Sequence, residues 1–256
     1  MEMPLSKIRL VTGMLLSNVA FAFAAIQFDA ATTRSVAQTN GAVAAWMSVR
    51  GGVEASPCHV EGAGWGLPRF DGGGISFSAG GGDAATPLSF DTSQTGLVSR
   101  AFIVADAASA APWQTLLDAP CPLRILPDAG AGAVAFSTSS VLSSISLSID
   151  FAPDATFTPG RHTYEAVFAE PCPLGGIHIG GNPATPAWGR SWCGSIHEVV
   201  FLPPEATEAD ARAVRAYLAK KWGTGCYSSG LADELAVLRA LGMKTGTLYG
   251  TGMFAR

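Results

Sequence analysis

The sequence predicts an all-β protein, an antiparallel β-sandwich with one short helix after the last strand. From residue 26 onward, short apolar runs are separated by Gly, Pro, Asn and Asp, which is the texture of a sandwich. Residues 145–151 alternate strictly between apolar and polar side chains, a pattern typical of a sheet with one buried and one wet face. A single helical pattern follows these strands. Together these observations favour a sandwich closed by a helix.

The predicted strands, in chain order, cover residues 26–29, 42–49, 74–78, 97–105, 114–117, 123–126, 133–137, 145–151, 161–168, 176–179 and 195–202. The Gly-rich segment 72–82 and the segment 180–190 are predicted as loops. No repeat of fixed period is visible, so a solenoid or a propeller is not expected.

The helix is predicted to begin after Thr207 and to end at Gly223. Asp210 stands three residues after Thr207, which is the spacing of a capping box. Gly223 suits the left-handed residue that closes many helices. The apolar stripe that would pack on the sheet consists of Val214, Tyr217, Leu218 and Trp222.

Residues 224–256 are predicted to form a helical tail of different character. Leucines recur through residues 231–241 with polar residues between them, and Gly242 follows, as expected for a second amphipathic helix. We expect this tail to be the place where an oligomer forms, if the chain assembles with a second copy or a larger partner.

Composition bounds the partners of the chain. With 256 residues, one large β-domain is expected, occupying residues 25–223. Charged residues make up 14% of the chain and the net charge is −4. No basic stripe is present that would neutralise a phosphate backbone, so nucleic acid is not an expected partner.

The first 24 residues have the pattern of a signal peptide. Lys7 and Arg9 precede an apolar stretch that ends in small residues, with cleavage expected after Ala24 or Ala22. Export would make the protein secreted or part of the cell envelope. No uninterrupted apolar run of roughly 18 residues occurs elsewhere, so no membrane span is expected after processing. A buried first strand and an uncleaved anchor are the alternatives.

The sequence contains five cysteines, which are compatible with a disulfide or with unpaired thiols. Cys121 and Cys172 lie in two nearly identical Pro-Cys-Pro turns, so a disulfide between them is the first prediction. The alternative is that all five are buried as small apolar side chains. The odd count leaves at least one thiol unpaired or pairing between chains. No zinc-type spacing is present.

The closing part of the chain resembles a known family. Residues 194–201 read Gly-Ser-Ile-His-Glu-Val-Val-Phe, residues 207–212 read Thr-Glu-Ala-Asp-Ala-Arg, and residues 217–223 read Tyr-Leu-Ala-Lys-Lys-Trp-Gly. This order resembles the last strand and helix of laminin G-like jelly rolls in bacterial surface proteins, within the concanavalin A-like lectin/glucanase superfamily. Weaker similarities extend over residues 26–223, among them the Gly-x-Val-x-x-Trp pattern of residues 41–46.

The resemblance implies a jelly-roll sandwich that binds rather than catalyses. Members of the family mostly bind glycans or proteins at the cell surface, some with calcium at one edge. Exposed aromatic rings are the usual sugar platforms, and the candidates in Gly- and Pro-rich loops are Trp65, Trp113 and Trp188. Calcium is a possible cofactor, with Asp83 and Asp106 as the candidate ligands, although no spaced Asp-x-Asp motif occurs. Glu198 is expected to be structural, capping the loop before the helix.

The sequence does not predict an enzyme. The Glu-x-Asp-x-x-Glu strand of retaining glycosidases on this fold is missing, and the acids near residue 208 suit helix capping. No Gly-x-Ser-x-Gly elbow is present. His59, His162, His178 and His197 stand in unrelated contexts. The first alternative to a binding module is a structural or assembly component of the cell envelope, and the second is a glycoside hydrolase.

Overall fold

The computed structural model describes residues 25–32, 34–58, 65–77, 85–109, 114–119, 123–127, 134–138, 146–152, 157–183 and 191–225. These residues fall into two compact units, one of residues Ala25–Glu205 that holds every described strand and one from Ala206 that holds the described helix. The predicted signal segment and the predicted helix of the tail lie outside the described residues, so both stay predictions.

The first unit is all-β. Its strands are β1 (Ile26–Asp29), β2 (Val36–Thr39), β3 (Ala42–Met47), β4 (Glu54–Pro57), β5 (Arg69–Phe70), β6 (Ile75–Ser76), β7 (Leu88–Phe90), β8 (Leu97–Ala107), β9 (Thr115–Asp118), β10 (Leu123–Pro127), β11 (Val134–Thr138), β12 (Ser146–Ile149), β13 (Gly160–Pro173), β14 (His178–Ile179) and β15 (Gly194–Leu202). A turn of 3-10 helix, η2 (Leu174–Gly176), lies between β13 and β14. Every pair of neighbouring strands among them is antiparallel, as the alternating pattern predicts.

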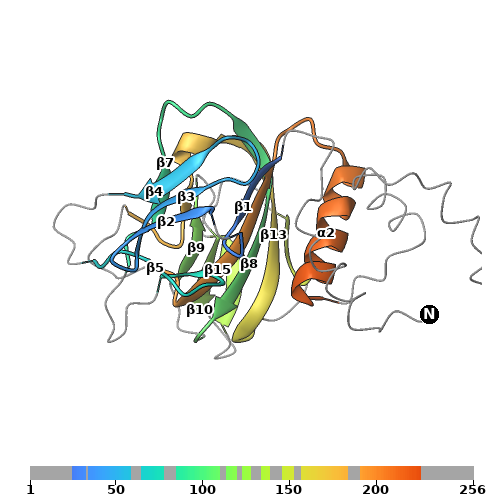
Figure 1. The fold of residues 1–256 in the computed structure, drawn as a ribbon. Coiled ribbons are helices and arrows are strands. Elements are labelled where there is room, and N and C mark those ends of the chain that lie inside the picture. The colour runs from blue at the N-terminus through green and yellow to red at the C-terminus, as the bar shows by residue number, and fades with distance from the viewer. Residues whose placement is uncertain are drawn as a thin grey trace, which may run out of the picture. The chain divides into compact units, whose positions relative to one another are not determined.

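The strands join in one continuous sheet that curls on itself (Figure 1). Along its path the order is β11-β10-β9-β14-β7-β4-β3-β5-β6-β15-β8-β13-β12, while β1 pairs with β15 and β2 with β3. Strand β15 is central to one half, because β8 lies along one of its edges while β1 and β6 share the other. Three long strands, β13, β8 and β15, therefore stand side by side.

Aromatic side chains from both halves of the sheet fill one core. The ring of Phe28 on β1 lies 5.3 Å from that of Trp46 on β3 and 5.7 Å from that of Phe90 on β7. Phe90 in turn contacts Phe201 on β15 at 6.0 Å. Because β1 and β15 belong to one half and β3 and β7 to the other, these contacts hold the curled halves together.

Each of the eleven predicted strands overlaps an observed one, but four strands were not predicted. Strands β2, β4, β5 and β7 are two to four residues long, and β4 ends in a proline. Such short segments carry too few apolar residues to show a period. The strand predicted from the alternating residues 145–151 is also shorter in the structure. It ends at Ile149, because the next two residues adopt positive φ and turn the chain.

The helix α2 (Glu208–Trp222) confirms the capping prediction at both ends. The Thr207 hydroxyl accepts a hydrogen bond from the backbone N–H of Asp210, and the Asp210 carboxylate accepts one from the backbone N–H of Thr207. Gly223 is left-handed, with φ of 68°, and its N–H donates to the carbonyl of Ala219. That the helix packs on the sheet stays a prediction. In the described part of the chain, no helix has the length and apolar character needed to span a membrane.

Candidate functional site

A β-bulge in β15 places His197 on the face of the sheet that points away from the core. Ile196 and Val199 both belong to the core cluster, so the two residues between them break the usual alternation. In the ladder with β8, Ile196 pairs with Ala105 and Glu198 pairs with the very next residue, Val104, which leaves His197 as the extra residue. Bulges of this kind redirect a side chain. We call the side of the sheet opposite the core the outer face.

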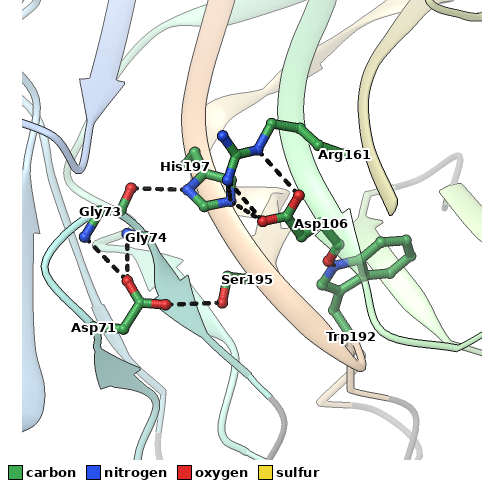
Figure 2. Close-up of polar contacts among 8 residues, drawn as sticks. All are labelled: Asp71, Gly73, Gly74, Asp106, Arg161, Trp192, Ser195 and His197. Atoms are coloured by element: carbon green, nitrogen blue, oxygen red, sulfur yellow. Dashed lines mark hydrogen bonds and ion pairs between the residues drawn. The ribbon is translucent and has the colours of Figure 1, made fainter. Parts of the chain in front are cut away.

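His197, Asp106 and Arg161 meet on this outer face, across three neighbouring strands (Figure 2). His197 Nε2 lies 2.7 Å from Asp106 Oδ2. The guanidinium of Arg161 donates two hydrogen bonds to the same carboxylate, from Nε to Oδ1 at 3.0 Å and from Nη2 to Oδ2 at 2.9 Å. The strand register explains the meeting, because Asp106 on β8 is directly opposite Arg161 on β13.

His197 keeps a hydrogen-bond partner in either protonation state of its ring. Its Nδ1 lies 2.8 Å from the carbonyl oxygen of Gly73, which only accepts, so Nδ1 carries a proton and donates it. Nε2 lies between the Asp106 carboxylate and Arg161 Nη2, which is 3.3 Å away. A protonated Nε2 donates to Asp106, and an unprotonated one accepts from Arg161. The two contacts at Nε2 are therefore alternatives.

The turn between β5 and β6 completes the cluster. Asp71 Oδ1 accepts from the backbone N–H groups of Gly73 and Gly74, at 3.0 and 2.7 Å, and Asp71 Oδ2 accepts from the Ser195 hydroxyl at 3.3 Å. A side chain at Gly74 would place its Cβ 2.7 Å from His197 Nδ1, so only glycine lets the turn come this close. These contacts hold the turn against β15. We call Asp71, Asp106, Arg161, Ser195 and His197 the outer-face cluster.

Trp192 fixes the backbone beneath the cluster. Its indole Nε1–H donates to the carbonyl oxygen of Asp106 at 3.0 Å (Figure 2). Its ring packs edge-on against that of Tyr164, with the ring centroids 6.0 Å apart. Both aromatic residues are fully buried. The carboxylate of Asp106 therefore projects from a position held by the core.

The charges of the outer-face cluster come close to balancing. Burial by itself would raise the pKa of the Asp106 carboxyl, but the hydrogen bonds and charges of Arg161 and His197 outweigh it and lower that pKa. Asp106 is therefore ionised at neutral pH. Its side chain is 36% exposed and that of Arg161 is 40% exposed, whereas that of His197 is only 6% exposed. The cluster thus presents polar atoms to solvent on a buried support.

Among the aromatic and acidic residues predicted as ligands, only Trp65 and Asp106 lie within the described residues. Trp65 is partly exposed and precedes β5. Trp113, Trp188 and Asp83 lie outside the described residues, so their predicted roles stay predictions. Asp106 belongs to the outer-face cluster, where its two oxygens already accept from Arg161 and His197. No group of three or more metal-ligating side chains occurs among the residues that the structure describes.

The predicted disulfide also stays a prediction, because Cys121 lies outside the described residues. Cys172 is buried near the end of β13, and its thiol donates to the carbonyl of Pro173 at 3.6 Å. Glu198, expected to cap the loop before the helix, is fully buried and accepts from Gln27 Nε2 on β1 at 2.6 Å. That contact ties the first strand to the last.

Sequence reasoning missed His197 and Arg161, which it left without partners. Asp106 and His197 are 91 residues apart, and His197 and Gly73 are 124 residues apart. The only local signal was the interrupted alternation of residues 195–200, where a histidine and a glutamate stand together inside an apolar strand. Comparisons with protein-family models, curated proteins and solved structures gave no match.

Proposed function

We propose that this chain is an exported binding module of the laminin G-like jelly-roll class, and that its outer-face cluster binds a neutral glycan at the cell surface. The observation that carries the proposal is the mixture of exposed acceptors and donors on a rigid support: two carboxylates, a guanidinium and a hydroxyl within one connected network.

The class rests on the arrangement of the strands and on the closing block of the sequence. The sheet divides into one run around β15 and β8 and another around β3 and β7, and both runs contribute to a single core. The block that resembles the family, residues 194–223, consists of strand β15 and the capped helix α2. The signal-peptide pattern of the first 24 residues supports export.

Sugar hydroxyl groups both donate and accept hydrogen bonds, so a site that recognises them needs both kinds of partner. Each carboxylate has about four acceptor positions. The three hydrogen bonds from Arg161 and His197 leave acceptor capacity on Asp106. Ser195 donates to Asp71, and its oxygen faces the same surface. Because the side chains already hold one another, a ligand would meet them without much reordering.

The charge balance favours a neutral ligand over a charged one. The carboxylates of Asp71 and Asp106 oppose the guanidinium of Arg161, so the cluster has no excess of positive charge. A phosphate or sulfate site needs a clear excess of positive charge, and a calcium site needs several oxygen ligands that are not already neutralised by cations. Neither condition holds among the residues of this cluster.

A glycan array probed with the purified full chain tests the proposal. We expect binding to one or more neutral oligosaccharides, unchanged by a calcium chelator. Arg161→Gln is expected to weaken that binding at least about tenfold, because it removes a bidentate partner of Asp106 as well as donors at the surface. Arg215→Gln is the matched control, because Arg215 lies on helix α2 and pairs with Glu208.

Three outcomes would count against the proposal. The first is an array without binding by a chain that is folded by circular dichroism. The second is binding that Arg161→Gln leaves unchanged. The third is binding only to charged glycans, since their recognition would need the charge excess that the cluster lacks.

A further inference from the structure

We propose that Thr158, His162 and Asp150 form a nucleophilic relay that cleaves O-acyl esters, an activity separate from glycan binding. Thr158 Oγ1 lies 3.1 Å from His162 Nε2, and His162 Nδ1 lies 2.6 Å from Asp150 Oδ2. A hydroxyl, an imidazole and a carboxylate are thus joined in the order that activates a nucleophile. These three residues take no part in the outer-face cluster.

The Asp150 carboxylate sets the tautomer of His162. A carboxylate only accepts hydrogen bonds, so the proton of a neutral His162 ring stands on Nδ1 and is donated to Asp150. Nε2 is then left as an acceptor, directed at the Thr158 hydroxyl. Because Nε2 faces a hydroxyl rather than a second carboxylate, it is able to take up the proton of that hydroxyl.

The turn after β12 holds Asp150 in place. Ile149 and Ala152 exchange two backbone hydrogen bonds, and the two residues between them have φ of 50° and 67°, which defines a tight hairpin turn of type I′. Asp150 Oδ1 also accepts from the backbone N–H of Thr163 at 2.9 Å. A phenylalanine with positive φ costs about 1–3 kcal/mol, so the surrounding contacts must hold Phe151 in this conformation.

Aromatic rings support the imidazole from the core side. The rings of His162 and Tyr164 meet edge to face at 6.2 Å, and Tyr164 packs in the same way on Trp192. Burial, followed by the charges of Asp150 and Asp106, raises the pKa of Tyr164 far above its ordinary value, so this tyrosine stays neutral. The side chain of His162 is only 16% exposed. Its orientation is therefore fixed by packing as well as by Asp150.

The reactive end of the relay faces solvent. Thr158 is exposed, while the preceding residue, Phe157, is buried and anchors the segment. Gly160 follows with φ of 124°, and a Cβ there would stand 3.9 Å from His162 Nε2. The glycine therefore leaves this approach to Nε2 open for a substrate or a water molecule.

The chemistry is a two-step acyl transfer. Thr158 Oγ1 attacks the carbonyl carbon of an ester while its proton passes to His162 Nε2. The bond from that carbon to the alcohol oxygen breaks, and the alcohol leaves with the proton from Nε2. Water then attacks the acyl-threonine, again giving its proton to Nε2. The carboxylic acid is released as Thr158 Oγ1 recovers that proton. The sum is ester plus water giving acid plus alcohol, with no oxidant or reductant.

The test uses p-nitrophenyl acetate with the purified full chain. We expect an initial burst that releases about one molecule of p-nitrophenol per protein chain. We also expect an acetyl group on the peptide that contains Thr158, found by mass spectrometry after acid quenching. Thr158→Val is expected to lose at least about 100-fold of the rate, and Thr158→Ser to retain most of it. Asp150→Asn is expected to lower kcat with KM unchanged, because Asp150 acts by positioning His162.

Thr92→Val is the matched control, since Thr92 is exposed and lies in the turn that follows β7. It is expected to leave the rate unchanged. Thermal melting of every variant separates loss of activity from loss of fold. Three results would overturn the relay: a Thr158→Val protein that keeps the wild-type rate, an acetyl group found on other residues but not on Thr158, or the complete absence of a burst. None of these results bears on glycan binding.

Discussion

Two histidines on strands that flank β8 in the same half of the sheet have different hydrogen-bond surroundings. His197 on β15 and His162 on β13 each have a ring nitrogen within 2.7 Å of a carboxylate oxygen. Their other nitrogens differ. In His197 the second nitrogen donates to the carbonyl of Gly73, whereas in His162 it faces the hydroxyl of Thr158. The His197 ring links strand β15 to the turn between β5 and β6. The His162 ring keeps an accepting nitrogen that faces a hydroxyl group.

The two histidine side chains also differ in how far they are buried. The side chain of His197 is 6% exposed and contacts an exposed Arg161, and that of His162 is 16% exposed and contacts an exposed Thr158. A carboxylate beside a histidine therefore does not define a catalytic site. What the remaining nitrogen meets decides whether the ring acts as a support or as a base.

The largest effect is expected from Gly194→Ala. A Cβ at Gly194 would overlap the carbonyl oxygen of Asp106, so β15 would have to move away from β8 at the base of the outer-face cluster. We expect a loss of about 3 kcal/mol in the free energy of unfolding, measured by urea denaturation. Gly66→Ala is the control, since nothing lies within 4 Å of its Cβ position. Equal stability of the two variants would refute the close packing at Asp106.

A smaller effect that separates the two histidines is expected from Asp106→Asn. It removes the negative charge and replaces one of the two accepting oxygens that face Arg161 and His197 with an amide donor. The side chain is about one-third exposed, so we expect a loss of about 1–2 kcal/mol at pH 7. The ester-cleaving rate should stay unchanged, because Asp106 takes no part in the relay. A variant that loses the esterase rate while glycan binding persists would reverse the assignment.

The pH dependence of this loss follows from the lowered pKa of Asp106. A carboxyl with a pKa below its unfolded value of about 3.9 stabilises the fold above that pH. The contribution disappears as the pH falls through the lower, folded pKa. The difference between the wild type and Asp106→Asn should therefore narrow below about pH 4. A difference that widens there would contradict the ion pair.

The smallest effect is expected at His178, a third histidine that lies outside both arrangements. Its buried Nδ1 has no hydrogen-bond partner within the described chain. Burial lowers its pKa despite the charge of Asp118, so the unfolded chain binds a proton more readily than the folded one. Stability should then decline as the pH falls below about 6.5. In His178→Gln, the melting temperature at pH 5 should decline less than in the wild type, by about 1–2 °C. Parallel pH profiles would show that His178 does not titrate in this range.

Features that depend on residues close in the sequence could be predicted from it. The register between strands far apart in the sequence could not. Helix α2 was predicted at both ends because Thr207, Asp210 and Gly223 act within a few residues of their partners. The outer-face cluster depends on three strands and a turn that meet only in the folded sheet. The bulge at His197 shows only as a broken alternation.

The relay was hidden for a different reason. Asp150 and His162 are only 12 residues apart, but their meeting depends on a tight turn at Asp150 and Phe151 that contains no glycine. A strictly alternating run through residue 151 predicts a longer strand, which would carry Asp150 away from His162. The positive φ of these two residues overrides the pattern.

The most direct test of the central claim is side-chain NMR of the full chain during titration with an oligosaccharide selected on the array. We predict that the Nε–H resonance of Arg161 and the ring resonances of His197 shift together and saturate with the same dissociation constant. The ring resonances of His178, in the other half of the sheet, should stay in place. Saturable shifts elsewhere in the chain, with Arg161 and His197 unmoved, would contradict the assignment of the outer-face cluster as the glycan site.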